Sequence, residues 1–397
     1  MLQKKTTIMF LGVAHALDHS FLTALPPILL LIVNDLGISL EAIGFASTFA
    51  YLLFGAGALV GGPLSDKIGE GRVMFLSLGL AGASTLILFV DGGFFGFVAM
   101  LVLSAAWTSF YHPTANSLIS KKYREDMGQA MAVHGVCGSI GQVFVPSVAV
   151  FLALAVGWRF AFVFLGILSM VASLYFVRMR SSDRRTQRVT HNIHHVLKDS
   201  RFWALLAYNI MMGLYFRGTE LFLPAYLTRV RGLSIELSGL AISLLMAFGV
   251  LGQFLGGVGG DRIGSAKALL VESLAVAIGF TFLQLEGTSS VMLFLVLYGV
   301  GFYATQPTTN ALTAEISSQS ERGLLYGIMF FTVFGLGSIS SAIAGHVAET
   351  SGLSLSFLIM FLLSFLALVF SLILRRVWRT HKSEDRVISD RVQEPDC

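Results

Sequence analysis

Histidine and carboxylate residues interrupt long apolar segments of this sequence and are the first candidates for chemistry. His15 and Asp18 lie three residues apart in one segment, and His112 and His134 lie in two others. Ionisable groups in apolar spanning segments are costly and usually mark a pathway. Imidazole and carboxyl groups exchange protons. The sequence therefore predicts a proton-handling group of Asp18, His15, His112 and His134. In the alternative, each histidine is a packed, hydrogen-bonded residue beside a kink, and His112 directly precedes Pro113.

A second charged pair, Arg217 and Glu220, repeats the three-residue spacing in the second half of the chain. Residues three apart share a face of a helix, so the two side chains can pair with each other. Alternatively, Arg217 is the counter-ion of an anionic substrate, because a guanidinium matches carboxylate and phosphate geometry. Four polar residues of other apolar segments complete the predicted substrate-binding set: Gln306, Asn310, Tyr111 and Asn116.

The elements that must position these residues are membrane-spanning helices. The 397-residue chain is 55% hydrophobic and only 13% charged, whereas a soluble protein carries about 25% charged residues. A spanning helix needs about 20 mostly apolar residues. Runs of that kind fall near 6–33, 40–62, 73–90, 94–119, 128–155 and 159–178, and again near 202–228, 235–258, 266–285, 290–314, 323–348 and 353–377. The fold class is all-α with twelve spanning helices; a β-barrel would show alternation with period 2.

The chain consists of two copies of one unit. The stretch 61–73 (GGPLSDKIGEGRV) reappears as 256–267 (GGVGGDRIGSAK) at an offset of 195 residues. The stretch 112–118 (HPTANSL) reappears as 306–312 (QPTTNAL) at an offset of 194. Two matches at nearly one offset predict a parallel repeat of two six-helix bundles, an arrangement found in some transporters.

Basic residues set the predicted orientation and domain division. With the N-terminus inside, 23 of the 27 lysines and arginines fall on the cytoplasmic side, so both termini are expected there. We expect an N-terminal bundle over 1–178, a basic cytoplasmic linker over 179–200, a C-terminal bundle over 201–378, and a disordered tail over 379–397. The linker histidines lack a cysteine or carboxylate cluster that would complete a metal site.

The glycine-rich loop after the second helix of each half resembles the best-known loop motif of the major facilitator superfamily. The resemblance covers residues 1 to about 378 and implies the fold of that superfamily. It also implies transport by alternating access, without an enzymatic reaction or a cofactor. The residues that match the motif, and that are implied to form a cytoplasmic latch, are Gly62, Asp66, Lys67, Gly69, Arg72, Asp261 and Arg262.

Shorter elements resemble one branch of the superfamily, the fosmidomycin-resistance exporters of bacteria. They are His15 with Asp18, the stretch 110–113 (FYHP) and the stretch 128–130 (GQA). The branch implies drug resistance by proton antiport. The segment 101–119 departs from many drug/proton antiporters, because it contains no arginine.

These observations predict a secondary active transporter in the inner membrane of a prokaryote, which exports a small amphiphilic or anionic compound in exchange for protons. Its expected partners are the substrate, protons and the lipid bilayer, and we expect a monomer that binds no nucleic acid, cofactor or metal. One alternative is proton-coupled uptake of an organic anion. Another is a non-transporting membrane receptor or assembly factor on the same fold.

Overall fold

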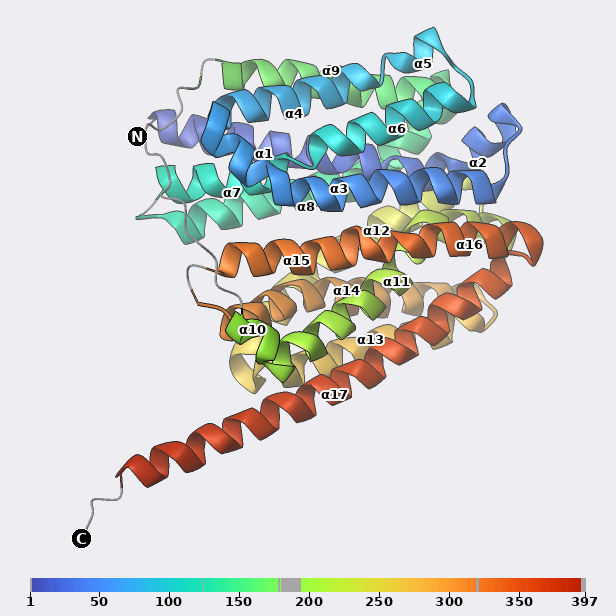
Figure 1. Ribbon diagram of the computed structural model, residues 1–397. Helices are drawn as coiled ribbons and strands as arrows, with labels where there is room; N and C mark the ends of the chain where they lie inside the picture. The colour runs from blue at the N-terminus through green and yellow to red at the C-terminus, as the bar shows by residue number, and fades with distance from the viewer. Residues whose placement is uncertain (1, 124, 178, 180–193, 319–320, 394–397) are drawn as a thin grey trace. The chain divides into compact units, whose positions relative to one another are not determined.

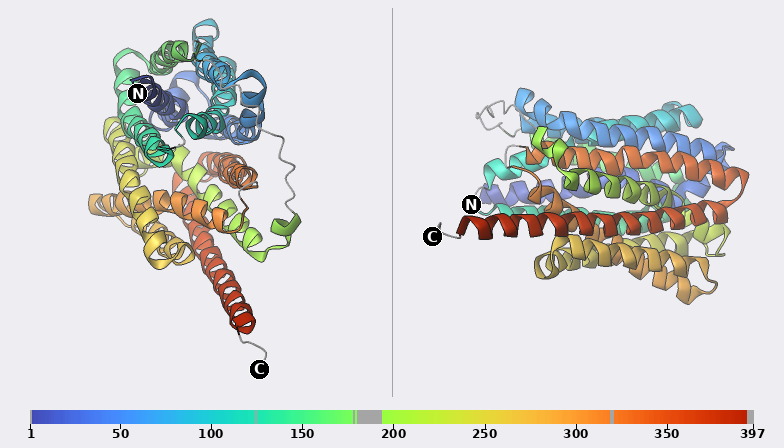
Figure 2. Two further views of the ribbon diagram at one scale, coloured as in Figure 1. Left: turned by 90° about the vertical axis from the view of Figure 1, so that its left-hand side faces the viewer. Right: turned by 60° about the horizontal axis from the view of Figure 1, so that its bottom comes forward.

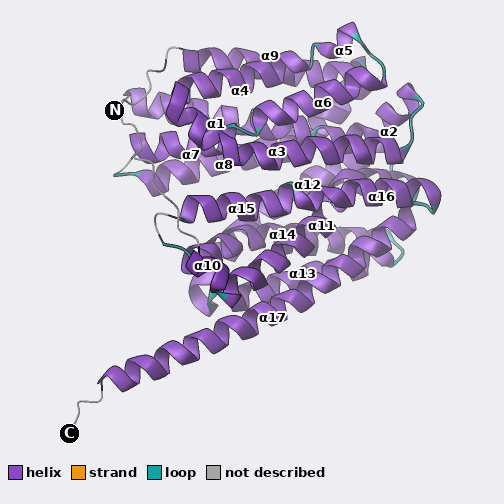
Figure 3. Cartoon of the chain, in the orientation of Figure 1, coloured by secondary structure: helices purple, strands orange, loops and turns teal. Residues whose placement is uncertain are grey.

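The computed structural model describes residues 2–123, 125–177, 179, 194–318 and 321–393, and these form helices without a strand (Figure 3). The helices of the first half are α1 (Leu2–Thr23), α2 (Leu25–Leu36), α3 (Leu40–Ile68), α4 (Glu70–Ser84), α5 (Ile87–Val90), α6 (Phe94–Thr108), α7 (Tyr111–Lys122), α8 (Met127–Val156) and α9 (Trp158–Val177). The remaining helices are α10 (His194–Lys198), α11 (Ser200–Arg229), α12 (Ile235–Ile263), α13 (Ser265–Gln284), α14 (Thr288–Glu315), α15 (Arg322–Phe334), the short 3-10 helix η1 (Leu336–Ser338), α16 (Ile339–Thr350) and α17 (Leu353–Gln393).

The predicted fold class is confirmed. Within the described residues, eleven helices, some built of joined pieces, are long and apolar enough to cross a membrane. The twelfth predicted helix is α11, which is 30 residues long and is made more polar by Arg217 and Glu220. Residues 180–193 of the predicted linker and 394–397 of the predicted tail lie outside the described residues.

Several of the predicted helices are broken near their middle. The first consists of α1 and α2, which meet at Ala24 just before Pro26 and Pro27. The fourth consists of α6 and α7, which meet just before Tyr111. Proline has no N–H and its ring clashes with the carbonyl four residues earlier, so Pro113 disrupts the helix around Ser109. The break places Tyr111 and His112 in the first turn of α7.

The backbone repeats with the same offset as the sequence. Seven glycines among the described residues have a positive φ, a conformation that glycine adopts without steric cost. Six of them form three pairs, each separated by 195 residues: Gly37 and Gly232, Gly69 and Gly264, and Gly157 and Gly352. The internal duplication therefore extends to the turns between helices.

The chain forms two compact units. The first comprises Met1–Arg188, Gly213–Ala247 and Phe330–Met360, and the second comprises Val189–Met212, Phe248–Met329 and Phe361–Cys397. In the first unit α1 packs against α8, α4 against α9 and α3 against α6 (Figures 1 and 2). In the second unit α13 packs against α14. The division of the sequence at residues 179–200 stays a prediction.

Helix α16 joins the first unit through a close contact with α3. A Cβ added to Gly44 would lie 2.4 Å from the carbonyl oxygen of Ser341. The Thr48 hydroxyl donates to the carbonyl of Ser338 at 2.8 Å, and the Glu349 carboxylate accepts from the backbone N–H of Leu40 at 2.8 Å. Small residues allow helices to approach this closely in membranes. A contact between the two halves of the sequence is thus built into this unit.

The last helix differs in length from the prediction. The sequence predicted a disordered tail from residue 379, whereas α17 continues to Gln393. This segment contains Arg, Lys, Glu and Gln, which are good helix formers, and no proline before residue 395. Polar composition alone therefore does not mark the end of a helix.

Candidate functional site

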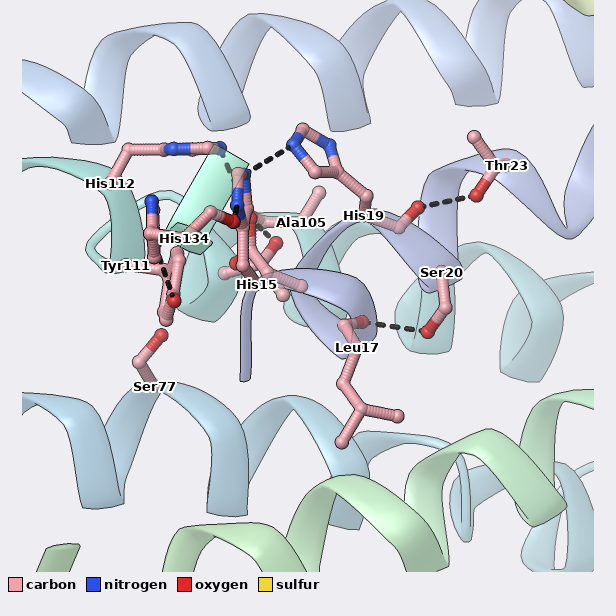
Figure 4. Close-up of polar contacts among 12 residues, drawn as sticks. His15, Leu17, His19, Ser20, Thr23, Ser77, Ala105, Tyr111, His112 and His134 are labelled. Carbon is pink, nitrogen blue, oxygen red and sulfur yellow. Dashed lines mark hydrogen bonds and ion pairs between the residues drawn. The ribbon is translucent and has the colours of Figure 1, made fainter. Parts of the chain in front are cut away.

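Four histidines and one aspartate meet between α1, α7 and α8 of the first unit, and Figure 4 shows the four histidines. His15, Asp18 and His19 belong to α1, His112 to α7 and His134 to α8. Asp18 is fully buried, and His15 and His134 are at most 9% exposed. The structure thus brings together the four residues that the sequence singled out for proton handling and adds His19. We refer to these five residues as the histidine cluster.

Close packing of α1 on α8 sets the position of His15. A Cβ added to Gly138 would lie 2.3 Å from Nδ1 of His15, and one added to Gly141 would lie 2.6 Å from Cα of Ala16. Only glycine at these two positions lets α8 approach α1 so closely. The approach brings the His15 ring onto the backbone carbonyl of His134, and the two imidazole rings stack with centroids 4.1 Å apart.

The hydrogen bonds of His15 determine its tautomer. Nδ1 of His15 donates to the carbonyl oxygen of His134 at 2.8 Å, because a carbonyl can only accept. Neutral His15 therefore presents Nε2 as an acceptor. Nε2 of His19 lies 3.1 Å from it and donates the proton between them (Figure 4).

The donor and the acceptor of the hydrogen bond between Tyr111 and His134 can be assigned in the same way. The Tyr111 hydroxyl donates its single proton to the carbonyl of Leu11 at 2.6 Å. Nε2 of His134, 3.0 Å from that hydroxyl, must then donate to it. Here the Tyr111 hydroxyl holds His134 against α1; its predicted role in substrate binding stays a prediction.

Asp18 is the least satisfied member of the cluster. Its Oδ2 lies 3.4 Å from Nε2 of His112, and neither carboxylate oxygen has a hydrogen-bond partner within the part of the chain that the structure describes. Burying a carboxylate without hydrogen bonds is costly. Such a group is neutralised by a proton or is satisfied by a bound ion or water.

His19 is the member of the cluster that the sequence analysis missed. It follows His15 by four residues, so it lies one turn further along the same face of α1. That spacing was visible in the sequence. What the sequence did not show is the rotation of α1, which turns this face toward α7.

Arg217 forms a second buried polar centre in the first unit. Its side chain is 2% exposed and forms an ion pair with Glu220. The guanidinium lies against the rings of Tyr51, Phe216 and Phe334, with distances to the ring centroids of 4.5, 4.4 and 4.2 Å. A cation over aromatic faces is stabilised electrostatically. The structure confirms that Arg217 and Glu220 pair; a role in substrate binding stays a prediction.

Three aromatic rings connect the two centres. Phe334 contacts Arg217 and stacks on Phe330 with centroids 4.3 Å apart. Phe330 and Phe54 each meet the His112 ring, with centroids 6.1 and 6.3 Å apart. We call Phe54, Phe330 and Phe334 the aromatic wall. The histidine cluster and Arg217 therefore border one apolar surface.

The other predicted substrate-binding residues are not part of these centres. Asn116 is exposed on α7. Gln306 and Asn310 belong to α14 in the second unit, where Gln306 accepts a hydrogen bond from Gln253 at 3.2 Å and Asn310 is exposed. Their assignment to substrate binding stays a prediction.

Comparison with known proteins identifies the family. The sequence profile of the Major Facilitator Superfamily matches residues 8–342. The chain belongs to this superfamily. The family and its relatives support a multi-pass membrane transporter and confirm that the protein is not an enzyme.

Several bacterial transport and sensor proteins resemble the chain. The hexuronate transporter of Bacillus subtilis is 26% identical over 396 residues, covering 88% of this chain and 89% of the relative. The probable sulfoacetate transporter SauU of Cupriavidus necator is 25% identical, covering 81% and 82%. The membrane sensor protein UhpC of Escherichia coli is 21% identical, covering 78% and 77%.

Solved structures support the superfamily fold. The inward-facing, unoccupied structure of a bacterial homologue of the human lysosomal transporter Spinster superimposes with a TM-score of 0.78 at 17% identity. The match covers 95% of this chain and 98% of the homologue. At this identity the likeness concerns the fold alone.

The superfamily loop motif contains an ion-pair network. Nζ of Lys121, at the end of α7, lies 3.3 Å from Oδ1 of Asp66 and 2.7 Å from Oε1 of Glu70. Glu70 opens α4 and is 2% exposed, whereas Asp66 is 43% exposed. Gly69, with φ of 91°, separates α3 from α4. Lys67 and Arg72 were the basic residues predicted for the latch, whereas the base that contacts Asp66 and Glu70 in the structure is Lys121.

The second copy of the motif makes the corresponding contact with other residues. Ser265 and Glu315 occupy the places of Glu70 and Lys121, and the Ser265 hydroxyl donates to Oε1 of Glu315 at 3.2 Å. Asp261 and Arg262 of this copy are exposed. The first copy therefore makes this contact through ion pairs and the second through a hydroxyl–carboxylate hydrogen bond. The latch function of both copies stays a prediction.

Proposed function

We propose that the protein is a secondary transporter that moves a small organic anion across the membrane by alternating access, and that Arg217 binds the anion. The observation that carries the proposal is the burial of the Arg217 guanidinium among three aromatic rings. Ionisable residues in spanning helices almost always face the interior of the helix bundle or a water-filled cavity. There they mark substrate or ion pathways.

The guanidinium retains capacity for a second anion beside Glu220. Arginine has five N–H donors in a planar fork. Nη1 donates to Glu220, and Nε has no hydrogen-bond partner among the described residues. A carboxylate or sulfonate can occupy the remaining donors with bidentate geometry. The aromatic rings favour an anion whose body is partly apolar or stacks on a ring.

Two of the similar transporters are named for organic anions. Hexuronates and sulfoacetate are small organic anions, and the transporters named for them resemble this chain over most of their length. They favour an organic anion as the substrate. Export as the direction of transport, proton coupling, membership of the fosmidomycin-resistance branch, the inner-membrane location with cytoplasmic termini, and the monomeric state stay predictions.

Binding by the purified protein tests the proposal. The probes are a hexuronate and sulfoacetate, with the neutral parent hexose as a matched control. We expect the anions to bind and the hexose not to bind. Arg217→Lys should weaken anion binding at least ten-fold although the charge is kept, because the bidentate fork is lost.

A double variant separates substrate binding from simple ion pairing. Arg217→Met combined with Glu220→Gln removes both charges, so no buried charge is left without a partner. If Arg217 binds the anion, this variant loses binding; if Arg217 only neutralises Glu220, it binds as the wild type does, and the proposal is wrong. Flux into liposomes then separates a transporter from a receptor: binding without flux, under any imposed gradient, would indicate a sensor.

A further inference from the structure

We propose that His15, His19 and His112 form a binding site for a divalent transition-metal ion such as Zn²⁺, with the carboxylate of Asp18 as its counter-charge. The site lies in the first unit, between α1 and α7. The evidence for it does not depend on the proposed organic anion, and its test uses no transport substrate.

The ligand atoms have the spacing that such an ion requires. One ring nitrogen from each of the three histidines lies within 4.8 Å of the other two. In a tetrahedral site with metal–nitrogen distances of about 2.0–2.1 Å, neighbouring ligand atoms are about 3.3–3.4 Å apart. Nε2 of His15 and Nε2 of His19 are already 3.1 Å apart. To bind the ion, His19 gives up its Nε2 proton and, as a neutral imidazole, carries its proton on Nδ1. The ring nitrogen of His112 must approach the other two to about the same distance to complete the site. Imidazole nitrogens suit Zn²⁺, Cu²⁺ and Ni²⁺.

The surroundings of His15 are those of a metal ligand. A ligating histidine almost always donates its other ring N–H to a carbonyl or a carboxylate, which fixes the tautomer and the ring orientation. Nδ1 of His15 donates to the His134 carbonyl, so the lone pair of Nε2 points toward His19 and His112 (Figure 4). His134 contributes its carbonyl, and its own Nε2 is directed to Tyr111.

Asp18 provides an independent reason for a cation at this place. Its carboxylate is fully buried, neither oxygen is hydrogen-bonded to any described residue, and the ion-pair contact that the structure gives it is with His112 at 3.4 Å. When Asp18 is ionised, four neutral histidines that merely packed together would not balance its charge. A divalent cation bound to His112 and its neighbours would do so, because buried charges are normally paired or coordinate metals.

The site is also accessible. The side chain of His112 is 22% exposed, and His19 is partly exposed, whereas His15 and Asp18 form the buried floor. An ion would enter from the side of His112 and His19, and the His112 ring must move to uncover its Nε2, which is buried.

A titration of the full-length protein in detergent tests the proposal. The protein is purified without a histidine tag, stripped with a chelator and titrated with Co²⁺, whose visible absorption reports its coordination; Zn²⁺ is then added in competition. We expect one Co²⁺ per chain with the intense absorption of a four-coordinate ion, and displacement by Zn²⁺. His19→Gln and His112→Gln should each weaken binding at least ten-fold, and Asp18→Asn about 10- to 100-fold.

His346→Gln is the matched control, because His346 is 57% exposed on α16 and pairs with Glu41. It should bind Co²⁺ as the wild type does. The proposal is overturned if the wild type binds no stoichiometric Co²⁺, if its absorption is the weak band of a six-coordinate ion, or if the variant lacking all three histidines keeps the site. Thermal unfolding gives a second readout: bound metal should raise the melting temperature of the wild type and of His346→Gln, and leave that of the ligand variants unchanged.

Discussion

Replacing Gly138 by alanine should displace His15 and disrupt the histidine cluster without altering any of its members. The new Cβ would lie 2.3 Å from Nδ1 and 2.4 Å from Cε1 of the His15 ring. Favourable contacts between carbon atoms are about 3.5–4.0 Å long. The ring must therefore move by about 1 Å or more, and its hydrogen bond to the His134 carbonyl, 2.8 Å long, is lost.

The magnitude follows from a comparison along the same helix. Gly135→Ala, three residues earlier in α8, introduces a Cβ that meets no atom within 4 Å. Both variants gain about 0.5–1 kcal/mol in helix stability, since alanine has the higher propensity. Only Gly138→Ala carries the costs of overpacking, about 1–3 kcal/mol, and of the lost hydrogen bond, about 0.5–1.5 kcal/mol. The two variants should differ by about 1.5–4.5 kcal/mol in the free energy of unfolding.

Thermal unfolding of the two variants in one detergent measures this difference, and a Co²⁺ titration of each measures its effect on the cluster. We expect Gly135→Ala to melt at or above the wild-type temperature and to bind Co²⁺ normally, and Gly138→Ala to melt lower and to bind Co²⁺ more weakly. Equal melting temperatures for the two variants would refute the close packing of α1 on α8. A lower melting temperature with unchanged Co²⁺ affinity would show instead that His15 is not a ligand.

Three further predictions concern parts of the protein outside the cluster. Asp66→Asn should slow transport while changing the free energy of unfolding by no more than about 1 kcal/mol, because its ion pair is exposed; normal flux in liposomes would contradict it. Lys121→Met should destabilise the protein more, by about 1–3 kcal/mol in chemical unfolding, since it leaves the buried carboxylate of Glu70 without its partner; equal effects of the two variants would contradict the geometry of the network. Gly44→Val should block the approach of α3 to α16, where the carbonyl of Ser341 would lie 2.4 Å from the new Cβ, and should abolish flux; wild-type flux would show that this contact is not needed for the transport cycle.

The sequence could predict the helices and the repeat because both depend on composition and order along the chain. Length and hydropathy identify a spanning helix without reference to its neighbours. The offset found in the two loop motifs reappears in the positive φ angles of Gly37 and Gly232, and of Gly69 and Gly264. Proline marked the break before α7 as well, although the sequence analysis treated the segment as one helix.

Contacts between helices could not be predicted in the same way. His19 and Lys121 act through residues on other helices, and such contacts depend on the rotation and register of each helix. A change of one residue in register turns a side chain by about 100° around the helix axis. The spacing of His15 and His19 indicated a shared face of α1, and only the packing against α7 shows that this face is turned toward His112.

The charges of the two buried centres bear on each other. Arg217 and Glu220 together are neutral, so an organic anion bound to Arg217 would bring one uncompensated negative charge into the first unit. Asp18, when ionised, contributes another, since the ion-pair contact that the structure gives it is with a histidine. Charges in an apolar interior are stable only when they are paired. One divalent cation at the histidine cluster would balance both, across the aromatic wall that separates them. The proposed metal site and the proposed anion site therefore supply each other with the opposite charge that a buried charge needs. Occupation of either site lowers the electrostatic cost of occupying the other.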